Sequence, residues 1–410
     1  MEKMNKNIIN QAINEAEVLE IVRDLVKIPS HWAQEKREIP IANHLNDLFE
    51  SEGIDVYLQE VIDGRSNVIA TLKGTGEGPS LMFNGHIDTV PPFGMEHPFD
   101  AIVKENKLYG RGAVDMKSGV GTMAYALIIL KRLGIKLKGD VVFAGVIDED
   151  AAGSAGARYI VEHGPITDYA IVTEPTKFRT AAAHKGMVEF EIAFKGRSVH
   201  SSVPDKGVNA IYAAADFVSK VEQKLIPKYN EIKHPLLDSP TINVGLIQGC
   251  AQANKVFLLG KSETFAGIVP DICNVYVDIR NTPNQTVEQI QVDFEDLARQ
   301  VVSTRNDVEV IVNYIPRVHP AMEIDVNNEL VVTVQNNIKK VTGNMPSVGG
   351  ETYWADSGLL SGIAKIPTLV FGPGDIGTAH SDHEYIEIDQ LANATKVYVL
   401  TAMDICGVSE

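Results

Sequence analysis

Residues able to bind a metal ion follow apolar runs or lie in glycine-rich loops at five places in this sequence. Histidine and carboxylate side chains without any thiolate suit Zn²⁺ or a similar divalent cation. Because the residues are dispersed along the chain, they predict a site assembled by the fold, which is more typical of catalysis than of a local structural metal site. The five places are His86 with Asp88, Asp115, the trio Asp148, Glu149 and Asp150, Glu174, and His380.

The stretch 81–92 shows the pattern most clearly. Its apolar start, residues 81–83, predicts a short buried strand. In an extended segment, side chains two apart point to the same face, so His86 and Asp88 can share one site. A carboxylate beside an imidazole fixes the tautomer of the ring and strengthens it as a metal ligand. On this stretch alone, a surface histidine at a strand end is an equally good explanation.

Each of the other candidates also has an ordinary explanation. Asp115 could cap the helix that follows it, and Glu174 could be a turn residue before proline. Residues 148–150 could form a solvated acidic loop, and His380 could be a surface histidine. For a single residue the ordinary explanation is the more common one, but the five places together favour one common site.

Strand and helix patterns alternate outside the middle of the chain. This alternation predicts an α/β fold with a mixed, mostly parallel sheet flanked by helices. Ligands of such sheets lie at the carboxyl ends of the strands, where the candidate residues fall. The predicted strands are 55–59, 67–72, 81–83, 141–147, 169–172 and 367–371, and the predicted helices are 8–27, 41–51, 119–133, 155–163 and 330–341.

A different pattern occupies the middle of the chain. Its elements follow the order β-α-β-β-α-β, which is the ferredoxin-like arrangement. We therefore predict one domain made of residues 1–185 and 317–410, with a second domain, residues 186–316, inserted into it. The elements of the insertion are strands at 187–194, 241–248, 274–280 and 307–315 and helices at 207–225 and 286–304.

The composition narrows the class of protein. A chain of 410 residues is long for a single core and fits two domains. The net charge of −17 argues against nucleic acid as a partner, because phosphate binding needs a basic face. No apolar run is long enough to span a membrane, and no signal peptide is recognisable. The dispersed Cys250, Cys273 and Cys406 favour a reducing compartment, so we expect a cytoplasmic protein.

Four segments resemble the motifs of a co-catalytic zinc hydrolase family. That family includes acetylornithine deacetylase, succinyl-diaminopimelate desuccinylase, aminoacylase and the carboxypeptidase G group. The segments are residues 85–91, 110–119, 148–150 and 371–380, which stand in the family's order and span nearly the whole chain. The resemblance implies a zinc-peptidase-like catalytic domain interrupted by a ferredoxin-like lid that also forms a homodimer.

The resemblance also implies a role for each candidate. Two divalent ions, Zn²⁺ foremost with Co²⁺ or Mn²⁺ as alternatives, would share a water and lower its pKa. A general base would take the proton of that water and pass it to the leaving nitrogen. The implied roles are Asp115 as the bridging ligand, His86 and Glu174 on one ion, Asp150 and His380 on the other, Asp88 as the partner of His86, and Glu149 as the general base.

Three further residues are candidates for substrate contacts. His200 lies in a segment similar to the family motif whose histidine reaches a neighbouring subunit's site and stabilises the oxyanion. Arg280 resembles the arginine that grips a substrate carboxylate through a bidentate contact, although a salt bridge to Asp278 is an ordinary alternative. Asp356 stands where the family has a glycine-rich pocket loop, so it could shape the pocket or cap the next helix.

The sequence departs from the family pattern at two positions. Asp150 replaces a glutamate and is one methylene shorter, which bears on the position and occupancy of the second ion. Gly267 stands where the family commonly has an asparagine that helps to hold the substrate. The preceding loop, residues 250–266, is longer than expected and contains Asn254. The second departure and the longer loop bear on substrate preference.

These observations favour a metal-dependent hydrolase that removes an N-acyl group from an amino-acid-like substrate. A dipeptidase or carboxypeptidase of the same family is the alternative. A non-catalytic metal-dependent binding protein is a more remote hypothesis, because such a protein has no need of Glu149.

Overall fold

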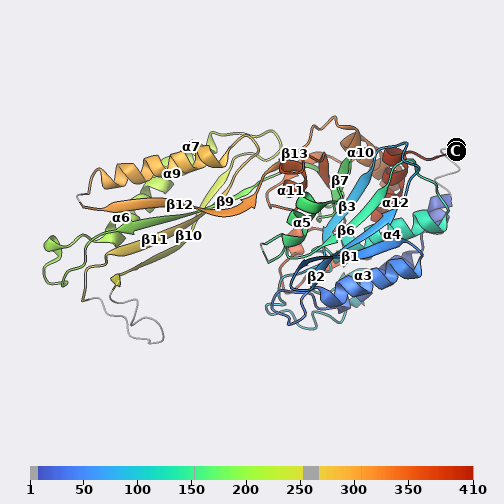
Figure 1. Cartoon of the computed structure of the whole chain (residues 1–410), viewed down its shortest axis with the longest axis horizontal. Coiled ribbons are helices and arrows are strands. Elements are labelled where there is room, and N and C mark those ends of the chain that lie inside the picture. Colours follow the sequence, from blue (N-terminus) through green and yellow to red (C-terminus); the bar gives the residue numbers. More distant parts are fainter. Residues whose placement is uncertain (1–7, 152, 253–266, 306, 410) are drawn as a thin grey trace. The chain divides into compact units, whose positions relative to one another are not determined.

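The computed structural model describes residues 8–151, 153–252, 267–305 and 307–409 (Figure 1). Asn254, in the long loop noted above, lies outside these residues. The chain divides into two compact units. The first unit comprises Met1–His184, Met322–Glu351 and Ala355–Glu410, and the inserted unit comprises Lys185–Ala321 and Thr352–Trp354.

A nine-stranded mixed sheet forms the centre of the first unit. Its strand order is β1-β2-β6-β3-β7-β15-β8-β13, with β14 paired to β8. The four central strands β6, β3, β7 and β15 run parallel to one another. The strands are β1 (Asp55–Ile62), β2 (Arg65–Leu72), β3 (Leu81–His86), β6 (Val141–Val146), β7 (Tyr169–Val172), β8 (Thr180–His184), β13 (Met322–Glu323), β14 (Val348–Glu351) and β15 (Thr368–Val370).

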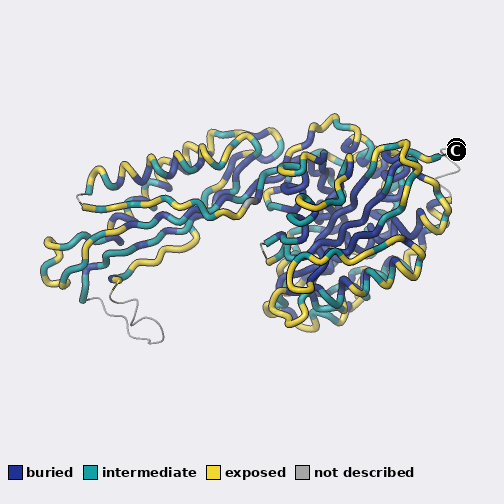
Figure 2. Tube along the Cα trace, viewed as in Figure 1, coloured by how far each residue is buried: buried dark blue, intermediate teal, exposed yellow. Residues whose placement is uncertain are grey.

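The central strands are apolar because both of their faces are covered. Every residue of β3 and of β6 is buried, which explains their continuous hydrophobic runs (Figure 2). The edge strand β1 instead alternates between exposed and partly buried residues. The core of this unit therefore lies around β3 and β6, at whose ends several candidate residues stand.

Helices flank the sheet (Figure 1). Helix α4, which is buried from Lys117 to Leu130, packs against both β3 and α12. Helix α2 begins at Asn14, whose side chain accepts hydrogen bonds from the first free N–H groups of the helix. The helices are α2 (Glu15–Lys27), α3 (Ile39–Ser51), α4 (Lys117–Arg132), α5 (Ala155–His163), α10 (Glu329–Thr342), α11 (Ser357–Gly362) and α12 (Ile388–Cys406). Among the described residues, no helix has both the length and the apolar character needed to cross a bilayer.

Several elements of the first unit have no counterpart in the sequence prediction. They are mostly short, apart from α12. A separate three-stranded sheet of β4 (Ile102–Lys104), β5 (Lys107–Tyr109) and β16 (Tyr385–Glu387) was not predicted, and neither was the 3-10 turn Ile376–Thr378. The other additions are β8, β13, β14, α11 and α12.

The inserted unit is a four-stranded antiparallel sheet in the order β10-β11-β9-β12. Two principal helices connect its strands in the predicted β-α-β-β-α-β sequence, so the fold class predicted from the sequence is confirmed. The elements are β9 (Met187–Lys195), a 3-10 turn (Pro204–Lys206), α6 (Ala210–Lys220), a π-helical turn (Val221–Leu225), α7 (Ile226–Asn230), β10 (Thr241–Cys250), β11 (Ile272–Arg280), α9 (Val287–Val302) and β12 (Glu309–His319).

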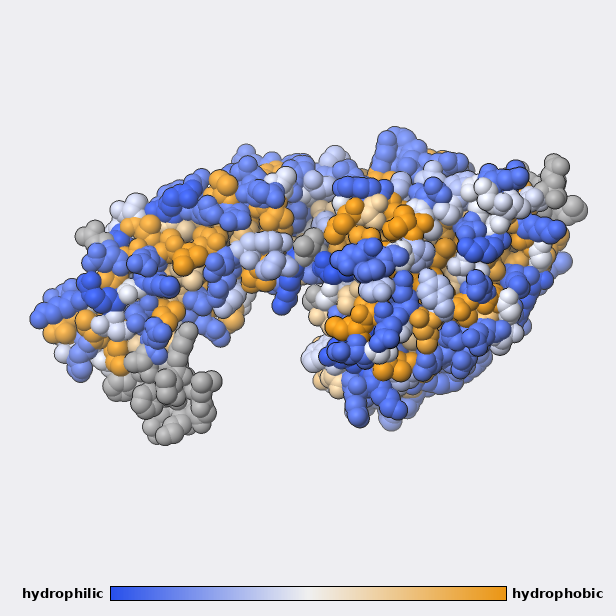
Figure 3. Space-filling model, viewed as in Figure 1, coloured by the Kyte–Doolittle hydropathy of each residue, from blue (hydrophilic) through white to orange (hydrophobic). Residues whose placement is uncertain are grey.

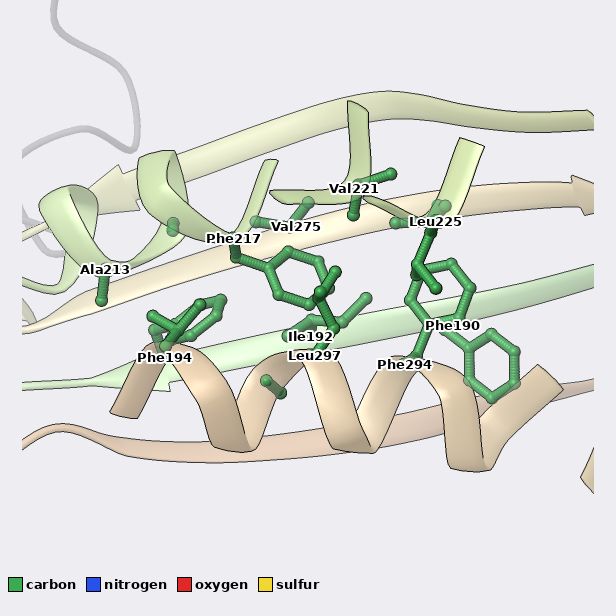
Figure 4. Close-up of a cluster of buried hydrophobic side chains, with 14 of the residues drawn as sticks. Phe190, Ile192, Phe194, Ala213, Phe217, Val221, Leu225, Val275, Phe294 and Leu297 are labelled. Carbon is green, nitrogen blue, oxygen red and sulfur yellow. The ribbon is translucent and has the colours of Figure 1, made fainter. Parts of the chain in front are cut away.

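Aromatic side chains fill the core of the inserted unit. Phe190 from β9, Phe217 from α6 and Phe294 from α9 meet between the helices and the sheet (Figure 4). The other side of the sheet is polar, and Glu191 there accepts hydrogen bonds from Asn274, Tyr276 and Asn313. The inserted unit thus has a hydrophobic core of its own.

On the face of the whole chain seen in Figure 3, hydrophobic residues reach the surface only in patches interrupted by hydrophilic ones.

Candidate metal centre

Most candidate residues of the first unit lie at or after the carboxyl ends of its four parallel central strands, whereas Asp115 precedes α4 and Asp356 precedes α11. His86 is the last residue of β3, and Glu174 follows β7 by two residues. The trio 148–150 follows β6, and the loop that ends at His380 follows β15. Since the carboxyl ends of neighbouring parallel strands meet at one edge of a sheet, the topology brings these distant segments together.

Asp115 lies between the two histidines. Its Oδ1 is 3.1 Å from Nε2 of His86, and its Oδ2 is 3.1 Å from Nε2 of His380. His86 Nε2 is also 3.7 Å from Glu174 Oε1. On the other side, His380 Nε2 is 3.2 Å from Asp150 Oδ1. One carboxylate therefore has an oxygen directed at each half of the cluster.

Three sets of possible ligand atoms each lie within 4.8 Å of one another. Asp115 belongs to two of them, so these two sets adjoin and share one carboxylate. Oδ2 of Asp150 is buried and has no hydrogen-bond partner among the described residues. Oxygen and imidazole donors crowded in this way fit a pair of divalent cations. The sets are His86, Asp115 and Glu174; Asp115, Asp150 and His380; and His86, Glu149 and Asp150.

Burial and crowding shift the pKa values of these groups strongly. Burial is the main cause that raises the pKa of Glu149 and of Glu174 well above the usual value. Hydrogen bonds to Asp115 and Asp150 raise the pKa of His380 to about 10. For Asp115 the effect of burial is outweighed by hydrogen bonds from both histidines, which lower its pKa. Bound cations would supply the positive charge that this acidic cluster lacks.

Asp88 supports the cluster in a way that the sequence did not reveal. The prediction paired its carboxylate with His86, but Nδ1 of His86 is 3.0 Å from the backbone carbonyl of Asp88 and 3.6 Å from the carboxylate. The carboxylate instead accepts hydrogen bonds from the backbone N–H groups of Glu149 (3.1 Å) and Asp150 (2.9 Å). Asp88 thus connects the end of β3 to the loop after β6.

Sequence reasoning missed a second support, the buried pair of Arg111 and Glu384. The Glu384 carboxylate accepts hydrogen bonds from Arg111 and from the backbone N–H groups of Val114 (3.0 Å) and Asp115 (3.1 Å). Arg111 also donates to the carbonyl of Ser381 at 3.0 Å, one residue after His380. Arg111 and Glu384 are 273 positions apart, and no local pattern connects them.

The ordinary explanations of Asp115 and Glu174 do not describe this structure. Helix α4 has no side-chain cap, because the Asp115 carboxylate contacts the two histidines instead. Glu174 is only 4% exposed, unlike a typical turn residue.

Comparison with known proteins identifies the family. The model of peptidase family M20/M25/M40 matches residues 82–404. The chain belongs to this family. An acetylornithine deacetylase from Shigella sonnei is 32% identical over 382 residues, which cover 90% of this chain and 92% of the relative. A probable succinyl-diaminopimelate desuccinylase from Staphylococcus aureus is 27% identical over 395 residues, covering 92% of this chain and 94% of the relative.

Solved structures agree in fold. The aminopeptidase PepT from Bacillus cereus superposes with a TM-score of 0.76 at 21% identity, covering 96% of this chain and 99% of the other. Human carnosine dipeptidase 1 gives a TM-score of 0.71 at 16% identity, covering 98% of each chain. The family model and the curated relatives confirm the predicted family and the prediction of a hydrolase.

The remaining candidates of this M20/M25/M40 hydrolase have local partners. His200 is exposed, and its Nδ1 is 2.8 Å from the Ser202 hydroxyl. Arg280 Nε is 3.2 Å from Asp278 Oδ2, the ion pair that the sequence analysis had left as an alternative. The carbonyl of Gly267 accepts a hydrogen bond from the backbone N–H of Ser201 at 2.9 Å. The roles of these residues toward a substrate stay predictions.

Asp356 lies at the start of α11 and is buried. Its side chain makes no capping hydrogen bond to that helix, so the capping alternative is not observed. Burial is the main cause that raises the pKa of Asp356 to about 6. Its negative charge also contributes to the raised pKa of Glu149 and of Glu174.

Proposed function

We propose that this chain is a metal-dependent amide hydrolase that removes an N-acyl group from an amino-acid-like substrate. The observation that carries the proposal is the pair of adjoining ligand sets sharing Asp115, with the Glu149 carboxylate beside them. The deacetylase and desuccinylase among the relatives support this class of substrate.

Two divalent cations, Zn²⁺ foremost and Co²⁺ or Mn²⁺ as alternatives, are part of the proposal. One would be held by His86, Glu174 and Asp115, and the other by Asp150, His380 and Asp115. When bound, the cations would polarise the scissile carbonyl and lower the pKa of a water. One solved structure of the same fold is described as a dinuclear metal-binding peptidase, which is consistent with this assignment.

Glu149 would move the proton in this reaction. Its Oε2 is 3.9 Å from His86 Nε2, and its backbone N–H is held by Asp88. The water oxygen bonds to the carbonyl carbon while Glu149 takes the water's proton. Glu149 then donates that proton to the nitrogen as the C–N bond breaks, releasing a carboxylic acid and an amine.

The variant Glu149→Gln tests this role. Glutamine keeps the shape of the side chain but cannot accept the proton, so we expect kcat to fall about 10²–10⁴-fold. Metal content per chain, measured by elemental analysis, should stay at two. Unchanged turnover with both metals bound would refute the mechanism.

A substrate screen separates the alternatives. N-acetyl, N-succinyl and N-formyl amino acids should be assayed beside dipeptides, with Zn²⁺, Co²⁺ and Mn²⁺ in turn. Preference for dipeptides would favour the dipeptidase or carboxypeptidase alternative. Metal binding without turnover of any amide would favour the non-catalytic one.

We further propose that the inserted unit forms a homodimer. In that assembly, His200 of one subunit would stabilise the oxyanion in the active site of the other. Arg280 and Asp356 are proposed, separately, to contact the substrate. Strand β10 lies at the edge of its sheet and exposes Leu246 and Ile247, which suits pairing with a second copy. Sedimentation equilibrium tests the dimer.

The compartment is a separate proposal. Cys250, Cys273 and Cys406 are all free thiols, which suits a reducing cytoplasm. Fractionation of cells that express the protein would test that location.

A further inference from the structure

A buried ion network holds the loop that carries Glu149 and Asp150. Its centre is Arg65 at the start of β2, whose side chain is only 10% exposed. The guanidinium binds Glu38 through two hydrogen bonds of 2.7 Å, from Nε and from Nη2. Nη2 also donates to Oδ1 of Asp148 at 2.7 Å. One arginine thus joins Glu38, the residue before α3, to Asp148, the second residue after β6.

Asp148 is fixed through its backbone as well as its carboxylate. It has a φ of 72°, in the left-handed region that aspartate tolerates better than most residues. Its carbonyl accepts hydrogen bonds from the N–H groups of Gly153 (3.2 Å) and Ser154 (2.6 Å). A Cβ at position 153 would lie 2.0 Å from Oδ2 of Asp148, so only glycine fits beside this carboxylate. The loop therefore closes tightly around Asp148.

The next two residues are held from the other side. Asp88 accepts the N–H groups of Glu149 and Asp150, as described above. The two contacts act on different parts of the loop. Asp88 binds the backbone N–H groups of Glu149 and Asp150, and Arg65 binds the carboxylate of Asp148, close to the end of β6. The Glu38 carboxylate is fully buried, and both of its oxygens bind Arg65. These two hydrogen bonds fix the orientation of the guanidinium.

We propose that Arg65, with Glu38 and Asp148, positions Glu149 and Asp150 for the reaction. This inference rests on the proposed function, because it assigns the network a purpose only if Asp150 holds a cation and Glu149 moves a proton. None of the three residues belongs to the sets of possible ligand atoms identified above. They are positioning residues, and their effect should fall on one half of the metal site. His86 ends β3 and Glu174 follows β7, away from the loop that Arg65 holds, so the half that they form should keep its affinity.

The test uses Asp148→Asn and Arg65→Lys. Asparagine leaves the Arg65–Glu38 pair intact, so this variant should fold even if Arg65→Lys does not. Lysine keeps the charge but lacks the planar fork that reaches two carboxylates at once. Residues that support metal ligands typically change metal affinity or activity 10–100-fold. We expect a loss of that size in kcat and in one of the two Zn²⁺ binding constants measured by calorimetry. KM and the other binding constant should stay within about threefold of wild type.

Arg37→Gln is the matched control. Arg37 approaches the same Asp148 oxygen at 3.7 Å, but its side chain is 39% exposed, so its contact is screened by solvent. This control should leave both binding constants and kcat within twofold of wild type. Asp148→Asn with the same unchanged values would overturn the proposal. Equal weakening of both binding events, with a lower melting temperature, would also overturn it, since that result indicates a structural role only.

The experiment also separates this inference from the proposed function. A wild-type protein that binds two cations but hydrolyses no amide would refute the proposed function and the role toward Glu149, while the metal constants would still decide whether Arg65 positions Asp150. A wild-type protein that binds no cation would overturn both.

Discussion

Removing the charge of Glu384 should weaken the binding of both cations at the candidate metal site. Glu384 is fully buried and binds Arg111, which is equally buried. It also accepts the N–H groups of Val114 and Asp115. Because Asp115 belongs to both adjoining ligand sets, a displacement of its carboxylate would weaken cation binding in both sets. The variant Glu384→Gln removes the charge and keeps the shape of the side chain.

The expected loss of stability follows from these contacts. Breaking a buried ion pair by changing one partner typically costs about 3–5 kcal/mol. The glutamine oxygen can still accept both backbone N–H groups, so the further cost of about 1–3 kcal/mol for each unsatisfied group is avoided. Arg111 also keeps its bond to the Ser381 carbonyl at 3.0 Å. We therefore expect about 3 kcal/mol, which for a unit of this size corresponds to a fall in melting temperature of roughly 5 °C.

Urea unfolding and zinc calorimetry measure the two effects. The unfolding should be followed for the metal-free protein, so that lost metal binding does not add to the loss of stability. Glu52→Gln is a suitable control, because Glu52 binds Arg132 in a similar paired fashion at the surface. The Arg132 side chain is 42% exposed, so this control should cost less than about 1 kcal/mol.

Two results would refute the reasoning. A loss of stability no greater than that of Glu52→Gln would mean that the buried pair contributes little. Weakening of only one Zn²⁺ binding event would mean that Glu384 does not act through Asp115. The second result would also break the contrast with Arg65, whose effect is expected on the Asp150 half alone.

Two other predictions concern stability. Phe217 is fully buried in the aromatic core of the inserted unit, so Phe217→Ala should cost about 3–5 kcal/mol in urea unfolding of that unit and leave zinc affinity unchanged. Hydrogen bonds from the N–H and hydroxyl of Ser80, both 2.7 Å, lower the pKa of Asp168. A lowered folded pKa contributes stability above the unfolded pKa of about 3.9, and that stability is lost as the pH falls through the folded value. Asp168 is exposed, so the difference in unfolding free energy between wild type and Asp168→Asn should be below about 1 kcal/mol at pH 5–7 and should shrink below pH ~4.

The sequence predicted the centre of the fold better than its edges. Strands β3 and β6 are continuous apolar runs because both faces are covered, and such runs are easy to recognise. Strand β8 is rich in alanine, a poor strand former, and is held by its neighbours rather than by local preference. Helix α12 has no side-chain cap and buries Thr395 and Thr401 among its apolar residues, so its helical period is weak.

The candidate ligands could be found because their residue types are unusual at strand ends, whereas their supports could not. Arg65, Glu38 and Glu384 are ordinary charged residues in the sequence. Their importance comes from burial and from partners distant along the chain, such as the 83 positions between Arg65 and Asp148. Asp88 was found, but only its closeness to His86 could be predicted. That its carboxylate holds the backbone of Glu149 and Asp150 depends on how β3 and β6 pair.

The departure at Asp150 takes on a specific meaning in this structure. Aspartate is one methylene shorter than the glutamate expected there, yet its Oδ1 lies 3.2 Å from His380 Nε2. A short side chain can reach that point only if its backbone is placed correctly. Asp88 accepts the backbone N–H groups of Glu149 and Asp150 within 3.1 Å, and Arg65 holds the side chain of the preceding Asp148 at 2.7 Å. The shorter ligand therefore makes the second half of the site more dependent on this network, and Asp150→Glu should partly restore zinc affinity in an Asp148→Asn background.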